Sequence, residues 1–198
     1  MLPAPHALLL DFDGLLADYD HRRHLQGLAA AAGCDAAQID QLLRAEGLEL
    51  AHARGELDGA ALLHELNTRL GSQLQERHWI EARVGAGRLR ADVLAVLRSL
   101  RDDIRIAVLT NNGALSVAAI KAQLPGMAVL GSACLGLRKP DPNCYLAATE
   151  RIGGTPPRTL FIDHLFRNVR GAREAGLQAD TAFHAQSLRR VLQRYRML

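Results

Sequence analysis

The apolar residues of the chain follow two patterns, continuous short runs and helical spacings, and these divide it into regions. Aliphatic runs occupy Ala7 to Asp11, Ile104 to Thr110 and Thr159 to Asp163. Such runs are typical of strands buried on both faces of a parallel sheet. Shorter runs at Met127 to Leu130 and Gln178 to Ala182 complete the set of predicted core strands.

After the first strand, apolar residues recur every three or four positions, and this spacing predicts helices. The sets include Leu62, Leu63 and Leu66, then Trp79, Ile80 and Val84. We expect about four short helices between roughly residues 18 and 86, and Trp79 in their apolar interior. The glycines that separate the helices are Gly33, Gly47, Gly55 and Gly71.

Beyond Gly87, predicted helices alternate with the remaining strands. One helix begins at Asp141-Pro142, which offers an Asp cap and a proline at the first helical position. Strands separated by helices imply a parallel sheet covered by helices on both faces. The sequence therefore predicts an α/β core of residues 1–16 and 87–198, with a helical insertion at 17–86.

The composition excludes several classes of protein. The chain has 198 residues, a formal net charge of +3 and 4% aromatic residues. Its basic residues are scattered, so a nucleic-acid surface is not expected. The three cysteines match neither a zinc site nor a disulfide framework. No apolar stretch approaches about 18 residues and no leader is recognisable, so we expect a cytoplasmic protein without a membrane partner.

Asp11 and Asp13 stand one residue apart at the end of the first strand, in the segment Asp11-Phe12-Asp13-Gly14. Carboxylates at the carboxyl end of such a strand lie where open α/β sheets bind ligands. Residues i and i+2 of an extended segment point the same way, so a cation or a shared proton would relieve their repulsion. The alternative at this point is a turn or a helix cap.

Other strand ends carry polar residues as well. Thr110-Asn111 ends the second strand, Lys139 follows the third, and Asp163-His164 ends the fourth, with Asn168 five positions after Asp163. Taken singly, Thr110-Asn111 could begin a helix, Lys139 could be a solvated lysine, and Asp163 could cap the next helix.

In this order and with this insertion, the chain resembles the haloacid dehalogenase superfamily, whose members are mostly Mg²⁺-dependent phosphohydrolases. The resemblance covers the whole chain, since the helical insertion matches the small all-helical cap of that family. It implies a Rossmann-like sheet of about five strands in the order 5-4-1-2-3. It also implies a hydrolase of small phosphate monoesters, such as a sugar phosphate.

The resemblance assigns a role to each residue. Asp11 would be the nucleophile and form an aspartyl-phosphate, and Asp13 the general acid and base. Thr110 and Asn111 would bind the phosphate, and Lys139 would neutralise charge. Mg²⁺ would be held by Asp11, by the main-chain carbonyl of Asp13 and by Asp163. His164 and Asn168 would lie next to these ligands and support them.

Two residues separate the alternatives within the family. Asp13 disfavours a 2-haloacid dehalogenase, because a halide leaving group needs no proton. His164 stands where many relatives carry a second acidic residue. Its imidazole would weaken Mg²⁺ binding, favour Mn²⁺ or another divalent metal, or be a tolerated replacement. Weakened metal binding leaves open a binding or regulatory protein with weakened or lost catalysis. The expected partner is a small phosphorylated metabolite, and the chain is expected to be a monomer or a homodimer.

Overall fold

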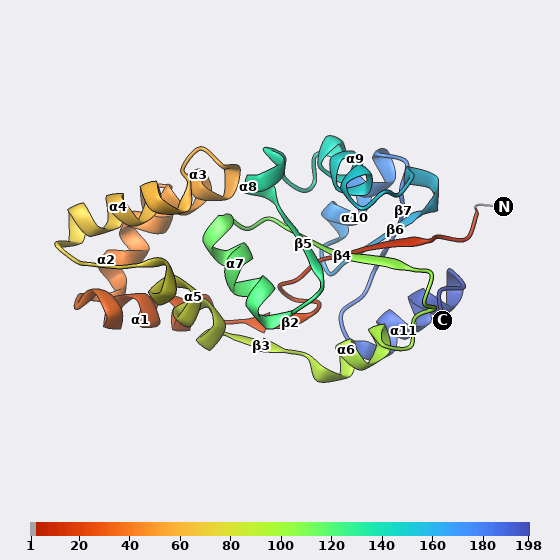
Figure 1. Cartoon of the computed structure of the whole chain (residues 1–198), viewed down its shortest axis with the longest axis horizontal. Helices are drawn as coiled ribbons and strands as arrows, with labels where there is room; N and C mark the ends of the chain where they lie inside the picture. The colour runs from red at the N-terminus through yellow and green to blue at the C-terminus, as the bar shows by residue number, and fades with distance from the viewer. Residues whose placement is uncertain (1–2) are drawn as a thin grey trace.

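A parallel sheet lies at the centre of the computed structural model, which describes residues 3–198 (Figure 1). Its five strands run in the spatial order β5-β4-β1-β6-β7. When these five strands are numbered 1 to 5 along the chain and the sheet is followed from β7 to β5, the order is 5-4-1-2-3, as predicted. The predicted fold class is therefore confirmed. The strands are β1 (Ala7–Leu10), β4 (Arg105–Thr110), β5 (Ala128–Gly131), β6 (Thr159–Asp163) and β7 (Gln178–Thr181).

Helices cover both faces of the sheet because successive side chains of a strand point to opposite faces. Leu8 and Leu10 pack with one group of helices, and Leu9 packs with another. The first group is α6 (Ala91–Leu97), α7 (Ala114–Gln123) and α11 (Ala185–Arg194). The second group is α9 (Pro142–Arg151) and α10 (Phe166–Glu174). Two short helical segments were not predicted: α8 (Ser132–Leu135) and a 3₁₀ turn (Pro156–Arg158).

The insertion contains five α-helices where about four were expected. Gly47, at φ +81°, turns the chain after a π-helical segment (Gln41–Ala45) and starts a separate helix. A left-handed φ of this kind suits glycine, which has no Cβ. The helices are α1 (His21–Ala32), α2 (Ala36–Asp40), α3 (Leu48–Arg54), α4 (Gly59–Leu70) and α5 (Glu76–Gly85).

The interior of the insertion is apolar and centres on Trp79, as predicted, which is 1% exposed among leucines of α1 and α4. The expected apolar set of α5 was partly wrong, however. Val84 is 36% exposed, whereas Arg83 is 1% exposed. A buried arginine requires a partner for its charge, and that partner lies in the α/β core.

The chain passes between core and insertion through a short antiparallel ribbon that was not predicted. β2 (Ala17–Tyr19) pairs with β3 (Gly87–Leu89), with Ala17 opposite Leu89 and Tyr19 opposite Gly87. Figure 1 shows α1 to α5 together at one end of the molecule, with α7 of the core next to α5. The insertion therefore rests on the α7 side of the sheet.

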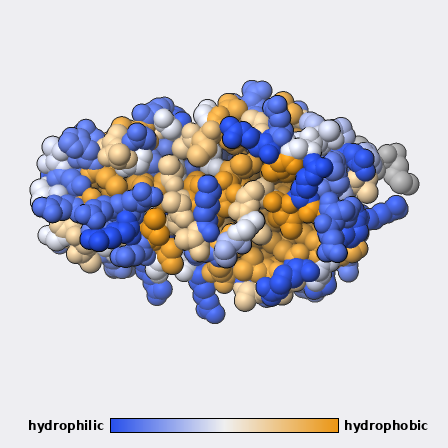
Figure 2. All heavy atoms as spheres, viewed as in Figure 1, coloured by the Kyte–Doolittle hydropathy of each residue, from blue (hydrophilic) through white to orange (hydrophobic). Residues whose placement is uncertain are grey.

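The surface of residues 3–198 is mixed in character. Figure 2 shows hydrophilic side chains at both ends of this face and apolar ones between them, over the core. No helix in this part of the chain is long and apolar enough to cross a bilayer.

Candidate active site

The polar residues at the strand ends come together because β4, β1 and β6 are neighbouring parallel strands. Asp11 follows β1, Thr110 ends β4, and Asp163 ends β6. All three side chains are buried, with exposures of 6%, 2% and 0%. Burial of two carboxylates so close together requires cations or hydrogen-bond donors between them.

Lys139 supplies the first of these cations. Its Nζ donates to Asp11 Oδ1 at 2.6 Å and to Asp163 Oδ2 at 2.9 Å. Asn111 fixes the lysine backbone, because its Nδ2 donates to Lys139 O at 2.8 Å and its Oδ1 accepts from Lys139 N at 2.9 Å. The side chain of Asn111 therefore positions Lys139, a contact that strand and helix periodicity do not indicate.

The charges in this cluster stabilise one another. Burial raises the pKa of Asp11, but Lys139 and His164 outweigh that effect and hold it below its ordinary value. Burial likewise lowers the pKa of Lys139, but Asp11 and Asp163 raise it above its usual range. At neutral pH Asp11 is therefore an anion and Lys139 a cation, which are the forms that attack on a phosphate ester needs.

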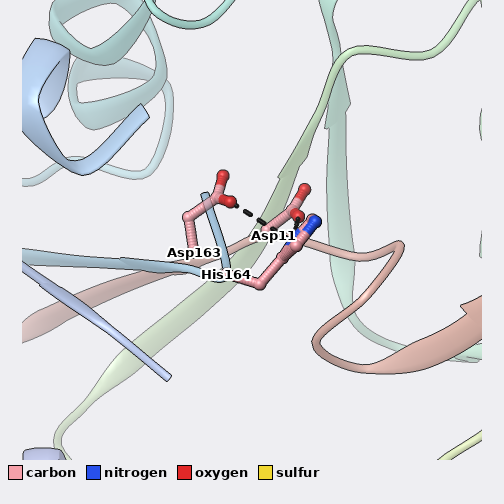
Figure 3. A group of neighbouring side chains, drawn as sticks. All are labelled: Asp11, Asp163 and His164. Atoms are coloured by element: carbon pink, nitrogen blue, oxygen red, sulfur yellow. Dashed lines mark hydrogen bonds and ion pairs between the residues drawn. The ribbon is translucent and has the colours of Figure 1, made fainter. Parts of the chain in front are cut away.

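His164 lies directly against the two carboxylates (Figure 3). Its Nδ1 is 2.9 Å from Asp11 Oδ2 and 3.4 Å from Asp163 Oδ1. The hydrogen bond to Asp11 raises the pKa of His164, against the opposite effect of burial. Gly14 makes room for the ring, because a Cβ at that position would lie 2.8 Å from the imidazole.

Asp163 is held by the segment that follows β6. Leu165 N donates to its Oδ1 at 2.8 Å, and Asn168 Nδ2 donates to its Oδ2 at 2.8 Å. The other side-chain atom of Asn168, Oδ1, is buried and has no hydrogen-bond partner among residues 3–198. A buried acceptor of this kind commonly receives a hydrogen bond from an ordered water or an ion-bound water.

Asp13 is oriented toward the insertion and does not contact Lys139. Arg83 Nη2, from α5, donates to Asp13 Oδ1 at 2.6 Å, and Asn112 Nδ2 donates to its Oδ2 at 3.1 Å. The guanidinium of Arg83 also lies 3.9 Å from the centre of the Tyr19 ring, a favourable cation–π arrangement. Both oxygens of Asp13 are thus engaged.

Arg83 and Asn112 were not among the predicted site residues. Arg83 lies four positions after the buried Trp79, so an arginine on a buried helix face was the available signal. Asn112 follows the predicted Thr110-Asn111 pair and also donates from Nδ2 to Thr110 Oγ1 at 2.7 Å. It therefore links the predicted phosphate-binding threonine to Asp13.

The donor set fits a divalent cation. Asp11, Asp163 and His164 can each offer one atom, and these atoms lie within 4.8 Å of one another. Two carboxylates together with waters suit Mg²⁺, and the unpartnered Asn168 Oδ1 is suited to accept from such a water. The imidazole of His164 is a better ligand for transition metals.

A cavity of about 240 Å³ opens above these residues, and its walls explain which predicted residues can meet a ligand. The cavity brings together seven of the eight residues predicted for the site, all except Asp163, with Asn112, Leu165 and two arginines in addition. Its lining includes Asp11, Asp13, Thr110, Asn111, Lys139, His164, Asn168, Asn112, Arg138 and Arg167. Asp163 does not line the cavity itself, but it contacts two residues that do, Lys139 and His164.

The sequence was compared with known families and proteins. A model described as haloacid dehalogenase-like hydrolase matches residues 5–176. The chain belongs to this family of hydrolases. The family resemblance expected from the motifs is thereby confirmed. The chain is also similar to Phosphatase MT3486 of Mycobacterium tuberculosis, with 28% identity over 87% of this chain and 85% of that protein.

Solved structures of the family share the fold. A family enzyme from Bacteroides thetaiotaomicron, in a magnesium complex, superposes with a TM-score of 0.76 at 19% identity, covering 96% of this chain and 100% of that one. L-2-haloacid dehalogenase from Xanthobacter autotrophicus gives a TM-score of 0.57 at 23% identity, covering 88% and 76%. At these identities the likeness concerns the fold of the hydrolase alone.

Proposed function

We propose that the protein is a Mg²⁺-dependent phosphatase that hydrolyses small phosphate monoesters through an aspartyl-phosphate on Asp11. The observation that carries this proposal is the pairing of Asp11 with Lys139 at 2.6 Å on the floor of the cavity, with Asp13 in its wall. Asp11 is held as an anion by Lys139, and Asp13 would transfer protons after a rearrangement of its hydrogen bonds. The phosphatase name of the mycobacterial relative supports the same reaction.

Magnesium would be held by Asp11, Asp163 and the main-chain carbonyl of Asp13. Structures of the Bacteroides thetaiotaomicron enzyme with magnesium, and with magnesium and inorganic phosphate, support this cofactor. The ion would supply positive charge that screens the phosphate from the attacking carboxylate. Mn²⁺ is the alternative cofactor, because His164 adds a nitrogen donor beside the carboxylates.

In the first step, a carboxylate oxygen of Asp11 attacks phosphorus and forms a P–O bond while the ester P–O bond breaks. Asp13, as the acid, gives its proton to the departing oxygen. Lys139 balances the charge of Asp11 and of the phosphoryl oxygens, and Thr110 Oγ1 and the backbone N–H of Asn111 donate to them.

In the second step, Asp13, now a carboxylate, takes a proton from water. The resulting hydroxide attacks phosphorus, the bond to Asp11 breaks, and inorganic phosphate leaves. Both oxygens of Asp13 accept hydrogen bonds in this structure, one from Arg83 and one from Asn112. Movement of α5 away from the loop after β1 would therefore favour proton transfer at Asp13.

Two other functions are less well supported. His164 in the place of a second acid favours a binding or regulatory protein with weakened catalysis, but the Asp11, Lys139 and Asp163 cluster retains the groups that hydrolysis needs. A 2-haloacid dehalogenase would have no use for Asp13, which here is held by two donors. We expect the phosphatase to act in the cytoplasm on a phosphorylated metabolite.

The test is a phosphatase screen of the full chain with an aryl phosphate and a metabolite panel, each with Mg²⁺, with Mn²⁺ and with a chelator. We expect metal-dependent release of inorganic phosphate. Absence of turnover with every metal, from protein shown to be folded by circular dichroism, would reject the proposal in favour of the binding protein. Release of halide from a 2-haloacid, without phosphate release, would favour the dehalogenase.

A further inference from the structure

Three arginines from separate parts of the chain line a cavity beside the candidate active site. Arg54 is at the end of α3 in the insertion, Arg138 directly precedes Lys139, and Arg167 is in the first turn of α10. All three line a cavity of about 600 Å³. That cavity shares Arg138, Lys139 and Arg167 with the active-site cavity, so the two adjoin.

The arginines have few carboxylate partners. Within residues 3–198, Arg138 and Arg167 form no ion pair with a carboxylate, and Arg54 has only Glu56, at 3.7 Å on the exposed surface. An exposed pair of this kind contributes little. The other acid of the cavity wall is Asp141, whose Oδ1 accepts from Asn143 N at the start of α9.

Arg138 is the most constrained of the three. Its side chain is half-buried, and its Nε is buried without a hydrogen-bond partner in the described part of the chain. Burial, and then the nearby charges of Arg54 and Arg167, lower the pKa of the Arg138 guanidinium. A desolvated cation beside two like charges is unfavourable by itself, and a bound anion would offset that cost.

We propose that Arg54, Arg138 and Arg167 form a second anion subsite, which binds the leaving-group side of the substrate. The substrate would then be a small phosphate monoester with a further anionic group, either a carboxylate or a second phosphate. Both groups present paired oxygens that match the fork of a guanidinium. This inference rests on the proposed function, since it assigns a substrate class to the same site.

The subsite also joins the two parts of the molecule. Arg54 belongs to the insertion, whereas Arg138 and Arg167 belong to the core. An anion that contacts all three would favour the arrangement in which α3 lies over the core loop. The second anionic group would therefore contribute to closure of the site as well as to affinity.

Equilibrium binding of phosphonates, which cannot be hydrolysed, tests the subsite independently of turnover. The ligands are propylphosphonate, phosphonopropionate and propylene bisphosphonate, titrated into the full chain with Mg²⁺ by calorimetry. We expect one or both of the two-anion ligands to bind about tenfold or more tightly than propylphosphonate, as charge-assisted hydrogen bonds imply. A carboxylate preference or a phosphate preference identifies the second group.

Arginine variants test whether the tighter binding of two-anion ligands depends on the proposed subsite. Arg138→Gln and Arg167→Gln should remove most of the advantage of the two-anion ligand over propylphosphonate, measured as the ratio of the two affinities in each variant. Arg170→Gln is the matched control, because Arg170 is an exposed arginine on the same helix. Arg167 is itself exposed, so its variant remains informative if Arg138→Gln does not fold.

Two outcomes would overturn the subsite. One is equal affinity of all three phosphonates for the wild-type protein, and the other is an equal loss of the advantage in Arg170→Gln. Turnover of an aryl phosphate and of the metabolite panel, with Mg²⁺ and with Mn²⁺, is measured on the same samples. Turnover without any two-anion advantage rejects the subsite and keeps the phosphatase, whereas a two-anion advantage without turnover rejects the phosphatase and keeps the subsite.

Discussion

Asp11 and Asp13 are separated by one residue in the sequence but face different regions of the molecule. Asp11 lies inside the α/β core and contacts Lys139 and His164, which the sheet and its loops hold in place. Asp13 faces the insertion and pairs with Arg83 of α5. The proposed nucleophile is therefore positioned by the core alone, whereas the position of the proposed acid and base depends on where the insertion lies.

The largest expected effect is on turnover, and it comes from changing Asp11, the aspartate that contacts the core. Asp11→Asn should lower aryl phosphate turnover on the order of a thousandfold or more, because an amide cannot form the aspartyl-phosphate. Initial rates with Mg²⁺ measure this, and circular dichroism checks the fold. Asp102→Asn, an exposed acid of the core, is the control and should keep wild-type rates. Wild-type turnover in Asp11→Asn would remove Asp11 as the nucleophile.

The next largest effect is expected from changing Arg83, the partner of Asp13 in the insertion. Arg83→Met should lower the free energy of unfolding by about 2 kcal/mol, since it removes a charge-assisted hydrogen bond to Asp13, whose side chain is 30% exposed, and the contact with the Tyr19 ring. Urea unfolding measures this.

Turnover of the Arg83→Met variant sharpens the comparison between the two aspartates. Its aryl phosphate turnover should fall several-fold, because Asp13 loses the donor that orients it, while Asp11 keeps Lys139. Arg83→Lys should restore part of both properties. A stable Arg83→Met variant with wild-type turnover would show that Asp13 does not depend on the insertion.

A third test uses a buried histidine of the insertion. Burial, with Arg83 and His21 nearby, lowers the pKa of His24 to about 3. Below about pH 6.5 the unfolded chain binds a proton that the folded chain does not. His24 should therefore lower the free energy of unfolding by about 2 kcal/mol between pH 6.5 and pH 5, a loss that deepens until about pH 3.

His24→Leu should remove that part of the pH dependence. Denaturant unfolding at both pH values gives the difference between wild type and variant. His64→Leu, which changes an exposed histidine of α4, should keep the wild-type dependence. An equal pH dependence in wild type and His24→Leu would contradict the buried, neutral state of His24.

The smallest expected effect concerns metal binding on the core side. His164→Asp should tighten Mg²⁺ binding about tenfold, because it replaces an imidazole with an oxygen donor that Mg²⁺ prefers. Calorimetric titration measures this, and Mn²⁺ affinity should change less. Unchanged Mg²⁺ affinity would show that His164 does not determine the metal site.

The sequence predicted the core side of the site better than the insertion side, for a physical reason. Asp11, Thr110 and Asp163 end neighbouring strands, so strand pattern and parallel topology suffice to bring them together. Arg83 was not predicted because its burial depends on an ion pair with a residue seventy positions away. Helical periodicity favoured the apolar Val84 for that face, which is instead partly exposed.

The ribbon of β2 and β3 has a consequence for protein engineering. Because Ala17 is paired with Leu89, the two ends of the insertion are only about 5 Å apart. A short turn could close that gap, so the whole insertion could be exchanged for that of another protein as a cassette. The obstacle lies on α7, where Leu115 packs in the apolar interior of the insertion and Ser116 accepts from Trp79. A transplanted cassette would have to provide partners for Leu115 and Ser116, or Leu115 would have to be replaced by a polar residue.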